Sequence, residues 1–169
     1  VGLDPNRFRR RPHHPWSEAG PIKLAWCGEL IPRKDPKAAI DAACAIRRRG
    51  FDVHLDMLGD GPLASKLKVP SEPGLEVVLV GHADPLEYFY SAHALVQTSR
   101  WEGLPRVALE AVALGRPTVG FDVKGVQDIP GAYRAPEGDI DELARQAIMA
   151  ATHGPRDLPL TDDLSYECA

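Results

Sequence analysis

Two carboxylates on either side of an expected helix start are the side chains of this sequence best placed to hold a ligand. Glu102 stands just before the helix, and Glu110 lies about a turn and a half inside it. At 1.5 Å rise per residue, the two lie roughly 10–12 Å apart along the axis. Between them, free N–H groups and the positive dipole end favour a phosphate, while carboxylates accept paired hydrogen bonds from vicinal hydroxyls. The segment therefore suits a ligand that combines a sugar, a diphosphate and a ribose.

Short apolar runs alternate with helical patterns and would position these residues. The expected strands are 22–30, 53–58, 76–80, 94–98, 117–121 and 133–135. The expected helices are 36–49, with Asp35 as its cap and Gly50 as its stop, and 63–68, 85–92, 105–114 and 140–151. Nearly continuous apolar strands are typical of a parallel sheet covered on both faces. The alternation predicts an α/β fold, a single Rossmann-like domain with a doubly wound parallel sheet.

Ligands of such sheets bind in the loops at the C-terminal ends of the strands. Each of these loops contains glycine or charged residues, as the segments 28–35, 59–62, 81–84, 99–106 and 122–126 show. We therefore expect one large anionic ligand lying across the sheet. The domain is predicted to span 22–152, preceded by a Pro-rich linker or lead-in over 1–21 and followed by a tail over 153–169, which suggests a truncated helix.

Composition excludes several classes of protein. The net charge of −4 argues against a nucleic-acid partner, and the basic run at 7–11 is interpreted as a solvated part of the linker. No apolar run approaches the roughly 20 residues needed to span a bilayer. Three cysteines without C-x-x-C spacing, Cys27, Cys44 and Cys168, fit free thiols in a reducing compartment. These features predict a cytoplasmic protein, and a start at Val1 suggests an excised piece of a longer chain.

The segment SRWEGLPRVALEAVALGRPTV resembles the E-x7-E signature of family 4 glycosyltransferases, which have the two-domain GT-B fold. Five further segments agree in order: GELIPRKD, LGDGPL, VGHADPLEYFYSAHALV, DVKGVQDI and APEGDIDELA. The opening VGLDPNRFRR is similar to the linker that enters the C-terminal domain of that family. The resemblance, which extends to about residue 151, implies a C-terminal domain that binds the nucleotide sugar of a hexosyltransferase.

The same resemblance assigns roles to individual residues. Glu110 would hold the ribose hydroxyls, and Glu102 a hydroxyl of the donor sugar. Lys34, together with Arg33, would neutralise the diphosphate and stabilise the charge that develops as it leaves. The other donor-binding positions would be Gly28, His82, Ala83, Gly103, Leu104, Arg106 and Val107. Many family members carry an arginine where this chain has Glu29, so Arg33 is expected to supply the missing charge.

The resemblance also implies a sugar transfer with retained anomeric configuration and with no metal or other cofactor. The acceptor site would belong to an N-terminal Rossmann-like domain that this chain lacks, and any membrane contact would come through that partner. Alone, the chain would bind the nucleotide-sugar donor and turn it over barely or not at all. A non-catalytic nucleotide-sugar-binding module, or a subunit of a split transferase, is the alternative.

Other motifs have less specific interpretations. Residues 59–64, GDGPLA, match the G-x-G-x-x-A of a nicotinamide-dependent oxidoreductase. However, they follow the second strand, and Pro62 removes an N–H where a pyrophosphate needs one. The D-x-D at 139–141 is interpreted as a helix cap by Asp139 rather than as a metal site. His82 is expected to fill its loop, and His93 to be a hydrogen-bonded core histidine.

Overall fold

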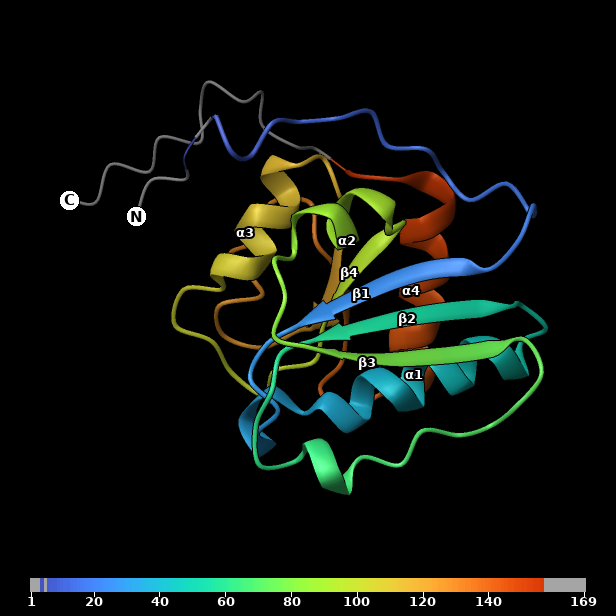
Figure 1. The fold of residues 1–169 in the computed structure, drawn as a ribbon. Coiled ribbons are helices and arrows are strands. Elements are labelled where there is room, and N and C mark those ends of the chain that lie inside the picture. The colour runs from blue at the N-terminus through green and yellow to red at the C-terminus, as the bar shows by residue number, and fades with distance from the viewer. Residues whose placement is uncertain (1–3, 5, 157–169) are drawn as a thin grey trace.

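Six parallel strands form one sheet in the order β3-β2-β1-β4-β5-β6 (Figure 1). The computed structural model describes residue 4 and residues 6–156. The strands are β1 (Ile22–Cys27), β2 (Val53–Leu58), β3 (Leu75–Gly81), β4 (Ala94–Gln97), β5 (Thr118–Phe121) and β6 (Tyr133–Ala135). The order reverses between β1 and β4, so the predicted doubly wound parallel sheet is confirmed.

Helices cover both faces of this sheet. On one face lie α1 (Pro36–Arg48) and α4 (Ile140–His153), which pack against each other. The other face carries α2 (Leu86–Ser91) over β1 and α3 (Arg106–Ala113) over β4 and β5. The sheet is therefore the middle of three layers. Strands β4 and β5 are buried along their whole length, as expected for a covered parallel sheet, but β2 and β3 carry polar residues and are only partly buried. No helix in the described part of the chain is long and apolar enough to cross a membrane.

Local capping signals fix the starts of two helices. The Asp35 side chain accepts a hydrogen bond from the N–H of Ala38 at 3.3 Å, and Pro36 occupies the first helical position. Asp139 accepts a hydrogen bond from the N–H of Glu142 at 2.9 Å, which confirms its interpretation as the cap of α4.

The helix predicted over 63–68 is wrong: the chain forms only the 3-10 turn η2 (Ala64–Lys66). The cause is tertiary, because the N–H of Leu63 donates to the carbonyl of Leu30 at 3.0 Å and ties the segment to the loop after β1. A Cβ on Gly59 or Gly61 would collide with the backbone of that same loop. The G-x-G of this segment thus permits two loops to pack closely.

The lead-in before β1 packs along the domain over much of its described length. The guanidinium of Arg11 lies 3.7 Å from the centre of the Tyr90 ring. Arg116 donates to the carbonyl of Pro12 at 3.2 Å, and the N–H of Trp16 donates to the carbonyl of Ala151 at 2.8 Å. The tail beyond residue 156, with its predicted truncated helix and Cys168, lies outside the described residues.

A histidine joins two strands on the sheet surface. The ring of His54 on β2 is hydrogen-bonded to Glu76 on β3 at 2.8 Å and to Asp56 at 2.9 Å. Burial lowers the pKa of His54, but the two carboxylates outweigh it, so the net pKa is raised above its ordinary value of 6.5. Protonation of His54 therefore stabilises the pairing of β2 with β3.

Candidate functional site

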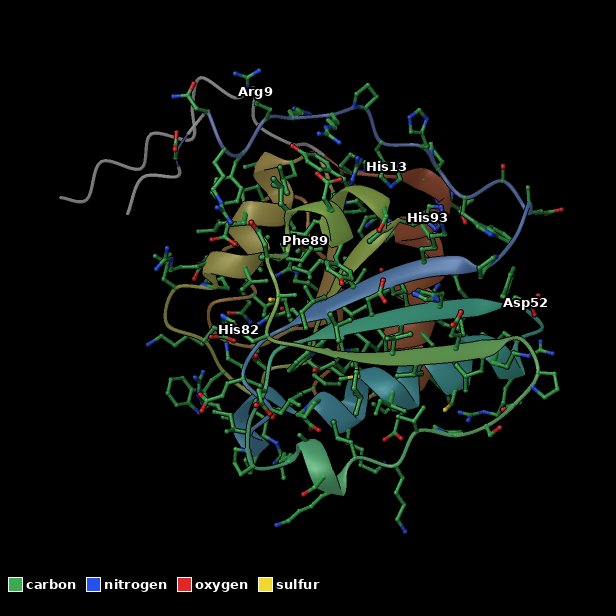
Figure 2. All side chains as sticks on the ribbon, in the orientation of Figure 1. Arg9, His13, Asp52, His82, Phe89 and His93 are labelled. Atoms are coloured by element: carbon green, nitrogen blue, oxygen red, sulfur yellow. The ribbon has the colours of Figure 1, made fainter. Side chains whose placement is uncertain are left out.

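The loops that follow the strands meet at one edge of the sheet, as a parallel arrangement requires. The 3-10 turn η1 (Pro32–Lys34) follows β1, and the segment 98–105 connects β4 to α3. Figure 2 shows His82 at this edge, beyond the arrowhead of β3, whereas His13 and His93 lie near the opposite half of the molecule. The residues predicted for ligand binding therefore come from neighbouring loops of one edge.

Glu102 is the centre of a buried polar cluster at this edge. Its carboxylate is only 5% exposed, and its Oε1 accepts hydrogen bonds from Lys34 Nζ at 2.5 Å, Ser99 Oγ at 2.5 Å and Gln97 Nε2 at 2.8 Å. Its Oε2 has a longer contact with Arg33, at 3.4 Å. One carboxylate oxygen is thus filled by three protein donors, and the other retains capacity for a ligand.

The charge of Glu102 is set by these neighbours. Burial by itself raises the pKa of this carboxyl, but the hydrogen bonds from Lys34 and Ser99 and the charge of Arg33 hold it below its ordinary value of 4.5. Glu102 is therefore ionised near neutral pH, and its carboxylate holds the side chains of Lys34 and Arg33 next to each other. Glu102 is thus a buried charge and not a solvent-exposed acid.

The loop after β5 contacts the backbone and the Cβ of Glu102. The N–H of Glu102 donates to the carbonyl of Lys124 at 3.0 Å. Gly125 has φ +89°, and a Cβ placed on it would lie 2.6 Å from the Cβ of Glu102. Only glycine permits both this backbone conformation and this approach. The position of Glu102 therefore depends on Gly125 as well as on its hydrogen-bond donors.

Glu110 differs from Glu102 in its hydrogen-bond partners. It is half-buried on α3, and its carboxylate accepts no hydrogen bond from any described residue. Burial raises its pKa, with Arg106 and Arg7 acting in the other direction. Burial also raises the pKa of Cys27 to about 11, with the charge of Glu110 adding to the shift. Glu110 is therefore a partly desolvated acceptor close to the end of β1.

The first turn of α3 leaves backbone donors available. Its cap residue Pro105 makes no side-chain hydrogen bond. The N–H of Arg106 is occupied by the carbonyl of Leu104 at 2.8 Å, but those of Gly103, Leu104 and Val107 donate to no described backbone group. Unpaired N–H groups at a helix start attract anions. Two large apolar side chains of this loop, Trp101 and Leu104, are more than half exposed.

The structure brings most of the predicted residues together. Arg33, Lys34 and Glu102 are in direct contact, and a Cβ on Gly28 would lie 3.7 Å from the Lys34 side chain. His82 is exposed and Ala83 half-buried on the adjacent loop. Glu29 is exposed and forms no ion pair with any described residue, so it is free to point away from an anion.

Sequence reasoning missed the residues that hold this cluster, namely Gln97, Thr98 and Ser99. A signal was present, because three polar residues end the apolar strand β4 where a buried strand would continue with apolar ones. Within residues 4 and 6–156, no group of three His, Cys, Asp or Glu side chains is arranged to hold a metal ion.

The chain matches a known protein family over most of its length. Residues 21–153 match the protein family described as "Glycosyl transferases group 1". The amylovoran biosynthesis glycosyltransferase AmsK of Erwinia amylovora is 26% identical over 174 residues, which cover 94% of this chain and 42% of AmsK.

Solved structures share the fold. TarM superposes with a TM-score of 0.70 at 21% identity, over 85% of this chain and 31% of TarM. Anabaena HepE in complex with UDP and glucose gives a TM-score of 0.64 at 21% identity, over 78% of this chain and 39% of HepE. The chain thus spans less than half the length of each of these three proteins.

Proposed function

The chain belongs to the group 1 glycosyl transferases, and we propose that it is the part of such an enzyme that binds the nucleoside diphosphate sugar. The observation that carries this proposal is the convergence of Lys34 and Arg33 beside the uncapped start of α3. The carboxylate of Glu110, half-buried and without a hydrogen-bond donor among the described residues, lies on α3. The complex of HepE with UDP and glucose, in a protein of the same fold, supports this choice of ligand.

The diphosphate would lie between the two cations and the helix start. Lys34 and Arg33 supply positive charge, and the N–H groups of Gly103, Leu104 and Val107 supply fixed donors. As the diphosphate leaves, these groups stabilise its growing negative charge without having to reorganise. Because this charge is already provided by the chain itself, we propose a reaction that needs no metal ion.

The hydroxyl groups of the donor would be held by the two carboxylates. Glu110 accepts from the vicinal ribose hydroxyls, since none of its lone pairs is used by a described residue. Glu102 accepts a hydroxyl of the donor sugar through Oε2, the oxygen that has only the longer contact with Arg33. The loop with His82 and Ala83 lies near the base.

The sugar would pass to an acceptor hydroxyl with retained configuration, as the resemblance to family 4 implies. In that family the acceptor residues lie on an N-terminal domain of GT-B architecture. The chain described here would therefore be the C-terminal domain. It would bind the donor by itself but require that second domain for turnover.

Calorimetric titration with UDP, GDP and ADP and their sugar conjugates, without metal, tests this proposal. We expect saturable binding of one base series and a loss of at least about tenfold in Glu110→Ala, because a charge-assisted hydrogen bond is removed. Glu137→Ala is the control, an exposed acid in the turn before α4 that should leave binding nearly unchanged. Equal binding by Glu110→Ala and wild type would contradict the proposed site.

A further inference from the structure

The end of β4 buries three consecutive polar side chains. Gln97 is 4% exposed, Thr98 is 0% and Ser99 is 1%. Burying a polar group is costly unless its hydrogen bonds are satisfied. Within the described part of the chain six polar or charged residues are buried: these three, Glu102, Arg116 and Thr118. Four of the six thus belong to one cluster, beside the proposed ligand site.

The hydrogen bonds of these three residues reach two different parts of the site. Gln97 and Ser99 face Glu102. Gln97 Nε2 donates to Glu102 Oε1 at 2.8 Å and to Ser99 Oγ at 3.0 Å, and Ser99 Oγ donates to the same Oε1 at 2.5 Å. One donor at the end of β4 and one just after it therefore fix one oxygen of the carboxylate and leave the other turned toward Arg33.

Thr98 points to the other side and holds the loop that carries the cations. Its hydroxyl oxygen lies 2.9 Å from the carbonyl oxygen of Lys34 and 2.8 Å from that of Asp35. The same oxygen accepts a hydrogen bond from Trp26 Nε1 at 2.9 Å. A strand end thus anchors the backbone of Lys34 while its neighbours anchor the carboxylate to which Lys34 Nζ is bound.

We propose that Gln97, Thr98 and Ser99 are positioning residues, here called the β4 clamp, which fix Glu102 and Lys34 in their donor-binding geometry before the ligand arrives. This inference rests on the proposed function, since it concerns the same site. None of the three needs to touch the donor. Side chains that are already held in the binding geometry lose little conformational freedom when the ligand binds. Residues that hold them there therefore increase the affinity without touching the ligand.

Nucleotide binding of paired variants tests the β4 clamp. Thr98→Val removes the hydroxyl that anchors the Lys34 loop. Thr118→Val is its control, a threonine on the adjacent strand β5 that is 1% exposed and whose hydroxyl has no partner among the described residues. With UDP, GDP and ADP as probes, we expect Thr98→Val to bind roughly 3- to 10-fold more weakly and Thr118→Val to bind as wild type.

Ser99→Ala tests the side that faces Glu102, in a double-mutant cycle with Glu102→Ala, which removes the acceptor of the Ser99 hydroxyl. The effect of Ser99→Ala, also about 3- to 10-fold in the wild-type background, should vanish in the Glu102→Ala background. Equal effects in both backgrounds would show that Ser99 acts elsewhere, and would overturn the proposal.

A readout without nucleotide separates the β4 clamp from the proposed function. Titration of the Glu102 carboxyl carbon by NMR should show a higher pKa in Ser99→Ala than in wild type, because a donor to the charged form is lost. An unchanged carboxyl pKa and unchanged affinity would refute the β4 clamp. If wild type bound none of the three nucleotides, the proposed function would fail, and the carboxyl titration would still decide whether Ser99 positions Glu102.

Discussion

Replacing Gly125 by alanine should disturb the position of Glu102 more than its small size suggests. The new Cβ would stand 2.6 Å from the Cβ of Glu102 and 2.7 Å from its carbonyl oxygen. Gly50, just after α1, provides the matched control. Its φ is +93°, close to the +89° of Gly125, and a Cβ placed there meets nothing within 4 Å. The two substitutions therefore share the backbone penalty and differ in the contact with Glu102.

The expected sizes follow from these two components. A left-handed conformation costs alanine about 1 kcal/mol, and both variants gain a similar amount from a less flexible unfolded chain. Overpacking against a backbone that must move adds about 1–3 kcal/mol at Gly125 only. The free energy of unfolding of Gly125→Ala should therefore fall below that of Gly50→Ala by about 1–3 kcal/mol.

Urea unfolding at pH 7, followed by tryptophan fluorescence, measures this difference directly. Binding of the nucleoside diphosphate in the same two variants should weaken for Gly125→Ala and stay constant for Gly50→Ala. If the two variants differed by less than about 0.5 kcal/mol, within the scatter of ordinary surface substitutions, the close approach of Gly125 to Glu102 would not be the constraint inferred here.

Two further predictions concern ionised groups. Lys34→Met leaves the buried Glu102 with three of its four side-chain donors. Removal of one partner of a buried pair costs about 3–5 kcal/mol, so with these donors remaining we expect a loss of about 2 kcal/mol at pH 7 in urea unfolding. Because Glu102 has a lowered folded pKa, its stabilisation exists above the ordinary pKa of 4.5 and is lost as pH falls through the folded value. The gap between variant and wild type should therefore narrow below pH 4.5, and a constant gap would contradict this reasoning. His54→Gln should have the opposite pH dependence, because the folded pKa of His54 is raised. The stability that His54 adds should be complete below pH 6.5 and disappear as pH rises through the folded pKa, and an equal loss at pH 5 and pH 9 would show that the charge of His54 does not matter.

The layers of the fold could be predicted because their signals are local. Apolar runs located all six strands, and the caps at Asp35 and Asp139 fixed two helix starts within three residues of sequence. The expected first strand ended three residues too late, since residues 28–30 turn to meet the loop after β2. The missing helix at 63–68 has the same cause, a contact between Leu63 and Leu30 that no local pattern indicates.

The sequence predicted that residues of the candidate site lie at one edge of the sheet, but not which of them contact each other. The motif placed Glu102 and Lys34 at one edge of the sheet. Their 2.5 Å contact, between residues 68 positions apart, depends on how the loop after β1 and the loop after β4 pack against each other, and no local pattern indicates this. The environments of the two glutamates also could not be predicted. Glu102 has three protein donors on one carboxylate oxygen, whereas Glu110 has none among the described residues, because burial and partners are tertiary properties. The hydrogen bond from the N–H of Lys23 to His93 at 2.9 Å confirms the expected bonded histidine.

Mapping of ligand binding by amide NMR tests the central claim most directly. The nucleoside diphosphate that binds best would be titrated into the labelled chain without metal. We predict saturable shift changes at the amides of Lys34, Gly103 and Val107, with Gly138, in the turn before α4, unchanged. Shifts centred on the opposite edge of the sheet, near His13 and His93, or equal shifts throughout the domain, would contradict a donor site at the start of α3.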